Sequence, residues 1–329
     1  TDEVIENVDS YDFTSSYPYV MVSEKFPMST GVFVPVKSMK QFEFMTSKFC
    51  CVFDVEITNI FAKSENENPI SVSKCFVKEN VSENNGRLVC AKKICMTITE
   101  IDYKVFSQFY TWEQIRIGRM ICYRKEYLPT EFVESILHLY EMKTKLKGVK
   151  GKEVEYLNSK EMLNSCYGMC VTNPLRDEIV CDGETWDVEH LTGEKQLEML
   201  NKYNDSKNRF LFYPWGIYVT AYARRNLFTG ISECGDDYIY SDTDSVKIMN
   251  GEAHKDYFKA YNDLSQQKLR AACKFHKIPF EKVEPVTIKG IAKPLGVWDY
   301  EGRYTRFKTL GAKRYMIEEE NALTVNGKN

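Results

Sequence analysis

Alternation of apolar and polar residues dominates the first hundred positions and predicts a β-rich N-terminal region. The segments CVFDVEITNIF (residues 51–61) and RLVCAKKICMTIT (residues 87–99) have the short period and the β-branched content typical of strands. Between them, Asn85-Gly86 is the strongest local turn signal, because both residue types accept a positive φ. The polar stretch at residues 64–69 predicts a loop. We expect strands and turns to continue to about residue 105.

A helical period then replaces the alternation. Residues 129–147 have Thr130 as a plausible N-cap, followed by apolar residues that fall on one helical face: Phe132, Val133, Ile136, Leu137 and Tyr140. Glycines separate this helix from a second at residues 152–170, which predicts a helical hairpin. Further helices are predicted at residues 194–203, 214–234 and 254–276, and a strand-like tail from residue 313. The fold class is α+β, without internal repeats.

The composition is that of a folded protein without membrane spans. Hydrophobic residues make up 43% of the 329 positions, and no run of about 18 apolar residues occurs. The 11 cysteines include no C-x-x-C pair, which indicates reduced thiols rather than a disulfide framework. None of the four histidines has metal-ligand spacing, so a zinc site is not expected.

Charge is informative only locally, because the net charge of -3 gives no overall case for nucleic-acid binding. Two basic clusters stand out, one before the second helix of the hairpin and one near the C-terminus. A solvated surface would explain each cluster as well as a strip of phosphate contacts would. Their members are Lys143, Lys145, Lys147, Lys150 and Lys152 in the first, and Arg303, Arg306, Lys308, Lys313 and Arg314 in the second.

The most unusual stretch is YSDTDSVKI, residues 240–248, in which Asp242 and Asp244 interrupt an otherwise strand-like segment. One interpretation is a plain turn, since aspartate favours turns and Asp-Thr could link two short strands. The other is that the turn presents carboxylates to a hard divalent cation, which would convert their repulsion into coordination.

Three other segments offer partners for these carboxylates. In YDFTSSYPYVM (residues 11–21), Asp12 ends a hydrophobic stretch and suits a metal site, although a helix N-cap by Asp12 or Ser15 is the alternative. In KEMLNSCYG (residues 160–168), a cation, an amide and a phenol share one helical face. In FKTLGAKRY (residues 307–315), alternation places Lys313 and Tyr315 on one side of a strand.

In order and spacing, DFTSSYP, KEMLNSCYG, YSDTDS and KRY resemble the A, B, C and K-x-Y motifs of family B DNA polymerases. The separation of the motifs most resembles the protein-primed subgroup of phages and linear plasmids, and the resemblance covers nearly the whole chain. It implies a right-hand polymerase fold, with an antiparallel palm sheet, helical-hairpin fingers, a partial thumb and two inserted subdomains.

The resemblance also implies roles for individual residues. Asp12, Asp242 and Asp244 match the catalytic carboxylates, with Asp12, Asp244 and the carbonyl of Phe13 as metal ligands. Tyr17 matches the residue that stacks under the incoming sugar and rejects a 2′-hydroxyl. The other nucleotide-binding matches are Phe13, Ser15, Ser16, Lys160, Asn164 and Tyr167, and the matches that contact primer or DNA are Thr243, Lys308, Lys313 and Tyr315.

The activity implied is template-directed addition of deoxynucleotides to a primer 3′-hydroxyl by two-metal phosphoryl transfer, with two Mg²⁺ ions that Mn²⁺ can replace. The implied partners are primer-template DNA, dNTPs and a terminal (priming) protein, with no membrane. We expect a monomer that acts in the cytoplasm of a bacterial cell bearing a phage or plasmid.

By position, the chain divides into segments that match parts of such a polymerase. We expect residues 171–212, the second insertion, to form a hairpin-like flap that contacts the template backbone and promotes strand displacement. Only 11 residues precede Asp12, so an N-terminal exonuclease domain is expected to be absent from this chain, which would be a polymerase-domain portion. The other segments are palm at 1–60, palm and a first, terminal-protein-contacting insertion at 61–128, fingers at 129–170, palm at 213–299, and the start of the thumb at 300–329.

Two other readings stay open. A reverse transcriptase also needs palm carboxylates, but it typically has two adjacent aspartates, whereas Thr243 separates them here. A degenerate palm that only binds nucleic acid or a terminal protein is the non-catalytic alternative, and the presence of all three acids argues against it.

Overall fold

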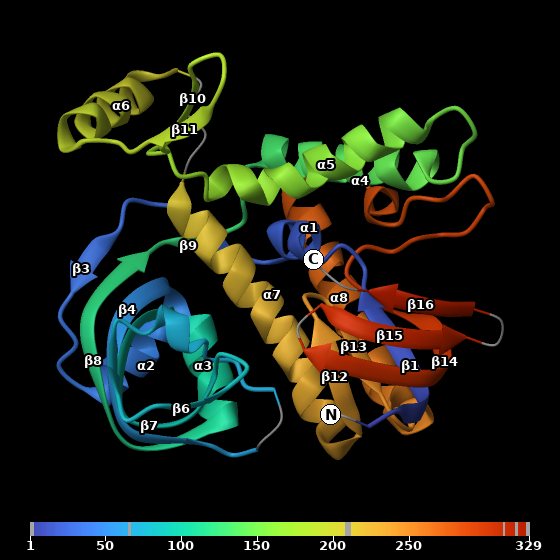
Figure 1. The fold of residues 1–329 in the computed structure, drawn as a ribbon, viewed down its shortest axis with the longest axis horizontal. Helices are drawn as coiled ribbons and strands as arrows, with labels where there is room; N and C mark the ends of the chain where they lie inside the picture. Colours follow the sequence, from blue (N-terminus) through green and yellow to red (C-terminus); the bar gives the residue numbers. More distant parts are fainter. Residues whose placement is uncertain (1–2, 65–66, 208–211, 312, 320–321, 327–329) are drawn as a thin grey trace.

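A computed structural model describes residues 3–64, 67–207, 212–311, 313–319 and 322–326. In these residues the chain forms two antiparallel sheets, a helical hairpin and a long central helix (Figure 1). The α+β class predicted from the sequence is therefore confirmed. Parts of the predicted loop at 64–69 and of the predicted tail strand lie outside the described residues.

The first sheet joins the two ends of the chain. Strand β1 (Ile5–Phe13) lies between β13 and β14, so the N-terminal strand is paired on both sides by C-terminal ones (Figure 1). All of the pairings are antiparallel. The other strands, in chain order, are β12 (Tyr238–Asp242), β13 (Ser245–Ile248), β14 (Trp298–Gly311), β15 (Arg314–Glu319) and β16 (Ala322–Asn326).

The second sheet forms a separate body in the order β3-β8-β4-β7-β5, with β6 paired to β7. Asn85 and Gly86 have φ values of 48° and 75° between β6 and β7, which confirms the predicted hairpin turn. The strands are β3 (Val32–Val34), β4 (Cys50–Ala62), β5 (Val77–Glu79), β6 (Ser82–Asn84), β7 (Arg87–Thr99) and β8 (Tyr110–Tyr123), and its helices are α2 (Met39–Lys48) and α3 (Glu100–Phe109).

Two expectations about this region were wrong. We expected residues up to 60 to belong to the sheet that carries Asp12, but β4 pairs along its length with β7 and β8 instead. We also expected helical structure after residue 105, but only α3 is helical there, and the 14-residue strand β8 follows it. The second sheet therefore begins well before residue 61, at β3.

The helical hairpin consists of α4 (Thr130–Leu146) and α5 (Glu153–Cys170), as predicted. The predicted cap is wrong, because Thr130 is already helical and its hydroxyl bonds to His276 Nδ1 at 2.9 Å. Beyond α5 the chain forms a small hairpin of β10 (Glu178–Cys181) and β11 (Trp186–Glu189), followed by α6 (Gly193–Asp205). The helix predicted at 194–203 is thus confirmed.

Helix α7 (Tyr213–Cys234) runs between the two sheets (Figure 1). Helices α7 and α8 (Lys255–His276) are the remaining two helices that the sequence predicted. The half-buried Arg225 of α7 donates to Glu24 at 2.7 Å, and Lys268 of α8 donates to the same carboxylate at 2.6 Å. This shared ion pair fastens α7 and α8 to the end of α1 (Ser16–Ser23). Short elements complete the fold: β2 (Phe26–Pro27), β9 (Lys125–Glu126) and the 3₁₀ turns η1 (Val72–Lys74), η2 (Gly235–Asp237), η3 (Gly251–His254) and η4 (Phe280–Val283).

All 11 cysteines are free thiols, which confirms the reading of the cysteine pattern. Within the described segments, no helix combines the length and the apolar content needed to cross a lipid bilayer.

Candidate active site

The two aspartates of the YSDTDS stretch lie at a tight turn of the first sheet. Strand β12 ends at Asp242 and β13 begins at Ser245, with these two residues paired across the turn. Thr243 adopts a φ of 58°, and the Asp244 N–H donates to the Asp242 carbonyl at 2.6 Å. The prediction that Asp-Thr links two short strands is therefore confirmed. A turn of this kind is compatible with cation binding by the two carboxylates, so it does not decide between the two interpretations.

Strand pairing brings this turn directly beside Asp12. In the register of β1 and β13, Asp12 lies opposite Ser245, and the Phe13 N–H donates to the Asp244 carbonyl at 2.7 Å. Two carboxylates more than 200 residues apart in sequence thus share one end of the sheet. The alternative of a helix N-cap at Asp12 is wrong, because Asp12 is within a strand.

The electrostatics of this pair show that the two carboxylates converge. Burial, followed by the negative charges of Asp12 and Asp242, raises the pKa of Asp244 to about 7. Burial also raises the pKa of Asp12, with Glu301 adding to the rise, while Lys247 and Lys143 oppose it. A site that holds two partly buried like charges is unfavourable unless a cation joins them.

The third acid, Asp242, is engaged elsewhere. Its Oδ1 accepts from Lys313 Nζ at 2.9 Å and from the Thr243 hydroxyl at 3.0 Å. The bond to Asp242 raises the pKa of Lys313. Lys313 itself was predicted to alternate with Tyr315 on a strand, which is wrong: it has a φ of 59° and precedes the first residue of β15. Its N–H donates to the Tyr240 hydroxyl at 2.8 Å, which fixes the turn over the acids.

The primer-side candidates lie on the same sheet. The Tyr315 ring packs against Tyr240 at 5.5 Å and Phe307 at 5.8 Å, in a small apolar cluster behind the turn. Lys308 lies in β14 opposite Met316, and it is half-buried. Strand pairing therefore places Lys308, Lys313 and Tyr315 near one another.

Lys143 is a site residue that sequence reasoning missed. This lysine of α4 donates from Nζ to the Ser15 hydroxyl at 3.0 Å. Burial lowers its pKa, as do the neighbouring charges of Lys160 and Lys147, while Asp12 and Asp244 raise it. The only signal in the sequence was membership of a basic cluster, which a solvated surface explained equally well. Ser15 occupies the N-cap position of α1, but its side chain makes no capping bond.

Aromatic residues from two elements meet above this end of the sheet. The ring centroids of Tyr17 on α1 and Tyr167 on α5 are 4.7 Å apart. Ser16, the first residue of α1, is buried. Lys160 and Asn164 lie on the same helix as Tyr167 but stay exposed, outside its buried stripe. The structure thus brings Tyr17 and Tyr167 together, whereas Lys160 acts through its charge on Lys143, whose pKa it lowers.

Among the described residues, no group of three or more His, Cys, Asp and Glu side chains is arranged to hold a metal ion. The converging set is two carboxylates, Asp12 and Asp244, with Lys143 close to both. Carboxylate oxygens are the ligands that Mg²⁺ prefers, and lysines neutralise phosphate. The arrangement can therefore bind a hard cation together with a phosphorylated ligand.

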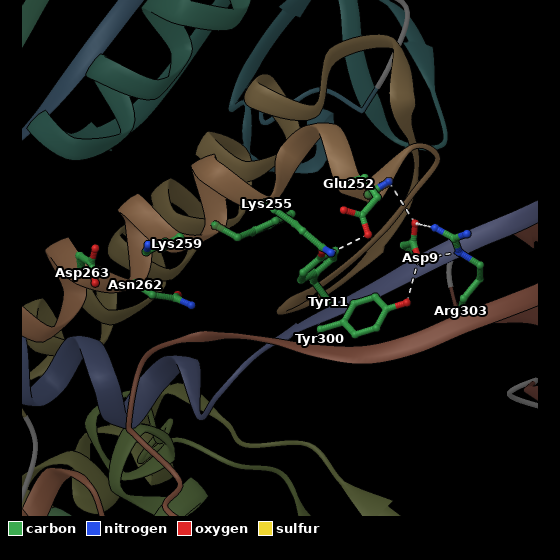
Figure 2. A pocket seen from close by; sticks show the side chains of 11 residues that line it. Asp9, Tyr11, Glu252, Lys255, Lys259, Asn262, Asp263, Tyr300 and Arg303 are labelled. Carbon is green, nitrogen blue, oxygen red and sulfur yellow. Dashed lines mark hydrogen bonds and ion pairs between the residues drawn. The ribbon is translucent and has the colours of Figure 1, made fainter.

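A cavity of about 380 Å³ is lined by residues of β1, η3, α8 and β14 (Figure 2). Its main polar group, the buried Asp9, accepts two bonds from Arg303 at 2.9 and 2.8 Å and one from the Tyr300 hydroxyl at 2.9 Å. Burial raises the pKa of Asp9, but these bonds and the Gly251 N–H outweigh it, so its pKa is lowered overall. The carboxylate is saturated by partners within the protein, so this network fastens β1 to β14 and η3.

Comparisons with known proteins point to one family. Residues 1–263 match the family model described as DNA polymerase type B, organellar and viral. The chain is 24% identical over 323 residues to the DNA polymerase of Bacillus phage B103, covering 97% of this chain and 46% of that one. It is 28% identical over 172 residues to the DNA polymerase of Bacillus phage phi29, covering 52% and 23%.

A solved structure of similar fold is the phi29 DNA polymerase complexed with primer-template DNA and incoming nucleotides, with a TM-score of 0.67 at 17% identity. The match covers 99% of this chain and 51% of that one. The same polymerase complexed with single-stranded DNA also gives a TM-score of 0.67. Some curated relatives match nearly the whole of this chain, and the chain spans about half the length of those relatives.

Proposed function

Since the chain belongs to the type B DNA polymerases of organelles and viruses, we propose that it extends a primer 3′-hydroxyl with deoxynucleotides directed by a template. The resemblance to family B drawn from the four motifs is confirmed, and a reverse transcriptase is not favoured. The observation that carries the proposal is the pairing of β1 with β13, which brings Asp12 beside Asp244. Convergence of two partly buried carboxylates with a partly buried lysine is costly for folding, and phosphoryl transfer accounts for it.

The residues present fit divalent metal ions. Asp12 and Asp244 would hold them, with the Phe13 carbonyl as a further oxygen ligand, because cations would offset the burial and the repulsion that together raise the pKa of Asp244. We propose two Mg²⁺ ions, replaceable by Mn²⁺. When bound, such ions supply activation of the primer hydroxyl and charge stabilisation at the pyrophosphate.

The chain's own residues would bind and orient the substrates. Lys143 and Lys160 neutralise the triphosphate of the incoming dNTP, while Tyr17 and Tyr167 form an aromatic wall for its sugar and base. We propose that Asp242 holds Lys313 in place rather than reaching the metal ions, so that Lys313 positions the primer terminus beside Tyr315. The roles of Ser15, Ser16, Asn164, Thr243 and Lys308 remain those that the motifs predict.

The elements match the parts of a polymerase as follows. Strands β1, β12 and β13 with α7 and α8 would be the palm, α4 and α5 the fingers, and β14 to β16, which continue the same sheet, the beginning of the thumb. The second sheet occupies the place of the first insertion, and we propose that it contacts a terminal protein that primes replication of a phage or plasmid genome in the bacterial cytoplasm. A monomer would then bind primer-template DNA and dNTPs.

The test of this function is primer extension by the full chain with dNTPs and Mg²⁺ on a templated primer. Extension that follows the template sequence supports the proposal. DNA binding without extension, at any divalent cation tested, would assign the chain to the non-catalytic alternative instead.

Replacing Tyr17 with valine is expected to raise incorporation of ribonucleotides relative to deoxyribonucleotides. The half-buried Tyr17 ring is held against Tyr167, so it would leave no room for a 2′-hydroxyl, whereas valine opens that space. Loss of a steric contact of this size is worth about 1–3 kcal/mol, or roughly 10- to 200-fold in discrimination. The ratio of kcat/KM values for the two nucleotides measures it, and unchanged discrimination would place the sugar gate elsewhere.

Replacing Lys143 with alanine is expected to raise the KM for dNTPs by about 10- to 100-fold, since hydrogen bonds to a charged partner contribute about 1.5–3 kcal/mol. Lys150, in the loop after α4, provides the matched control, because it belongs to the same basic cluster but is exposed. Lys150→Ala should leave the KM unchanged. A fall in melting temperature for Lys143→Ala with an unchanged KM would mean that Lys143 only supports Ser15.

A further inference from the structure

The hairpin of β10 and β11 projects beyond the end of α5 together with α6 (Figure 1). All eight strand residues are exposed, and no other strand in the described residues pairs with either edge. In the turn that closes it, the Asp182 carboxylate accepts from the N–H groups of Glu184 and Thr185 at 3.0 and 2.9 Å. The hairpin therefore presents two free edges in a defined register.

The two faces of the hairpin differ completely in chemistry. Ile179 pairs with Val188 and Cys181 with Trp186, so these four side chains share one apolar face. Ile179 and Trp186 are 73% and 76% exposed, so nothing in the described chain covers this face. The opposite face carries Glu178, Val180, Asp187 and Glu189. Lys195 of α6 forms an ion pair with Glu189, which places α6 toward the acidic face.

The charge of this insertion limits what can cover the apolar face. The hairpin itself, Asp177 to Glu189, has six Asp and Glu residues and no Lys or Arg, whereas residues 171–212 as a whole have nine acidic residues against five basic ones. Such a surface repels the phosphate backbone of DNA and anionic lipid headgroups. The expectation of salt-sensitive contacts with the template backbone rested on position alone, and the sign of this charge opposes it.

We propose that the β10–β11 hairpin docks a basic segment of another protein, which adds a strand to one of the free edges. Backbone hydrogen bonds to the edge would hold the segment in register. Its alternate apolar side chains would cover Trp186 and Val188, and the intervening Lys or Arg side chains would pair with the carboxylates on the opposite face. This binding goes beyond the polymerase activity proposed above and does not depend on it.

The test uses the full chain and a fluorescent synthetic peptide that alternates valine and lysine, with binding followed by anisotropy. Val188→Thr should weaken binding about tenfold, as expected for the loss of about 1.4 kcal/mol of apolar contact. Val180→Thr, the same substitution on the acidic face, is the matched control and should change affinity far less. Replacing the lysines by glutamate, or alternate residues by proline, should abolish binding, because these changes remove the charge complementarity and the backbone donors, respectively.

Several outcomes would overturn the proposal. Failure of the wild-type chain to bind the valine–lysine peptide would do so directly, as would equal effects of Val188→Thr and Val180→Thr, which would indicate non-specific attraction of a cation. Weaker binding of single-stranded DNA by Trp186→Ser would assign the face to nucleic acid. A dimer in sedimentation that Trp186→Ser dissociates would assign it to a second copy. Unchanged melting temperatures in the variants are the control for folding.

Discussion

Asp244→Asn is expected to lower the rate of primer extension by at least about 1000-fold, since the loss of a metal-binding carboxylate removes several kcal/mol of transition-state stabilisation. The turn itself should survive, because the bonds that place it run through the Asp244 backbone, to Asp242 and Phe13. DNA affinity should therefore change little. Single-turnover extension with Mg²⁺, alongside equilibrium DNA binding, measures the two effects separately.

The same substitution should have the opposite effect on stability. The pKa of Asp244 in the folded protein is about 7, above its ordinary value of 3.8, so ionising this carboxyl destabilises the fold. That cost is absent below about pH 4, grows as the pH rises and is complete above about pH 7. In metal-free buffer at pH 8, Asp244→Asn should therefore melt at a higher temperature than the wild type, and the difference should vanish in acid.

Asp242→Asn is the matched control, because it removes a carboxylate from the same turn. Asp242 is held by Lys313, so its loss should reduce extension less than the loss of Asp244 does. Near wild-type extension by both Asp244→Asn and Asp12→Asn would contradict the metal-site assignment. A lower melting temperature for Asp244→Asn at pH 8 would contradict the convergence of the two carboxylates.

Local signals explain why much of the fold was predictable. Helix α4 follows from apolar periodicity, and the β6–β7 hairpin follows from Asn85-Gly86, whose conformation depends on neighbours in sequence alone. The acids of the site were found because two carboxylates in a strand-like segment are costly without a partner. The order of the four motifs then indicated the family B DNA polymerases, which no single motif could have indicated alone.

The errors share a different cause, which is pairing between distant segments. Strand β8 alternates, but several of its positions are charged and exposed, so its partner β4 rather than its own sequence defines it. The same holds for β4, whose sheet could not be assigned before its partners were known. Lys143 and Lys313 lie in basic clusters that a solvated surface explains equally well. Only the packing of α4 on α1 and the turn before β15 show that these two lysines meet the acids.

Gly296→Ala is expected to lower the free energy of unfolding by about 4 kcal/mol and the melting temperature by roughly 8 °C. Gly296 has a φ of 70°, and a Cβ built there would lie 1.9 Å from Cδ2 of Tyr19. The Tyr19 ring cannot move away, because it is fully buried and its hydroxyl bonds to Ser265 at 3.0 Å. The Gly296 N–H also donates to the Thr14 carbonyl at 3.0 Å, so the strain reaches the chain just after Asp12.

A second glycine separates the clash from the backbone conformation. Gly290 has nearly the same φ, 75°, but a Cβ there meets no atom within 4 Å. Gly290→Ala should therefore cost only the left-handed strain, about 1 kcal/mol, and leave extension unchanged. Thermal unfolding of both variants measures the difference. Because Gly296 and Thr14 hold the loop just after Asp12, which we propose as a metal ligand, Gly296→Ala should also slow extension at temperatures where it is still folded. Equal melting temperatures for the two variants would mean that α1 can shift without cost, and that the position of Asp12 does not depend on this contact.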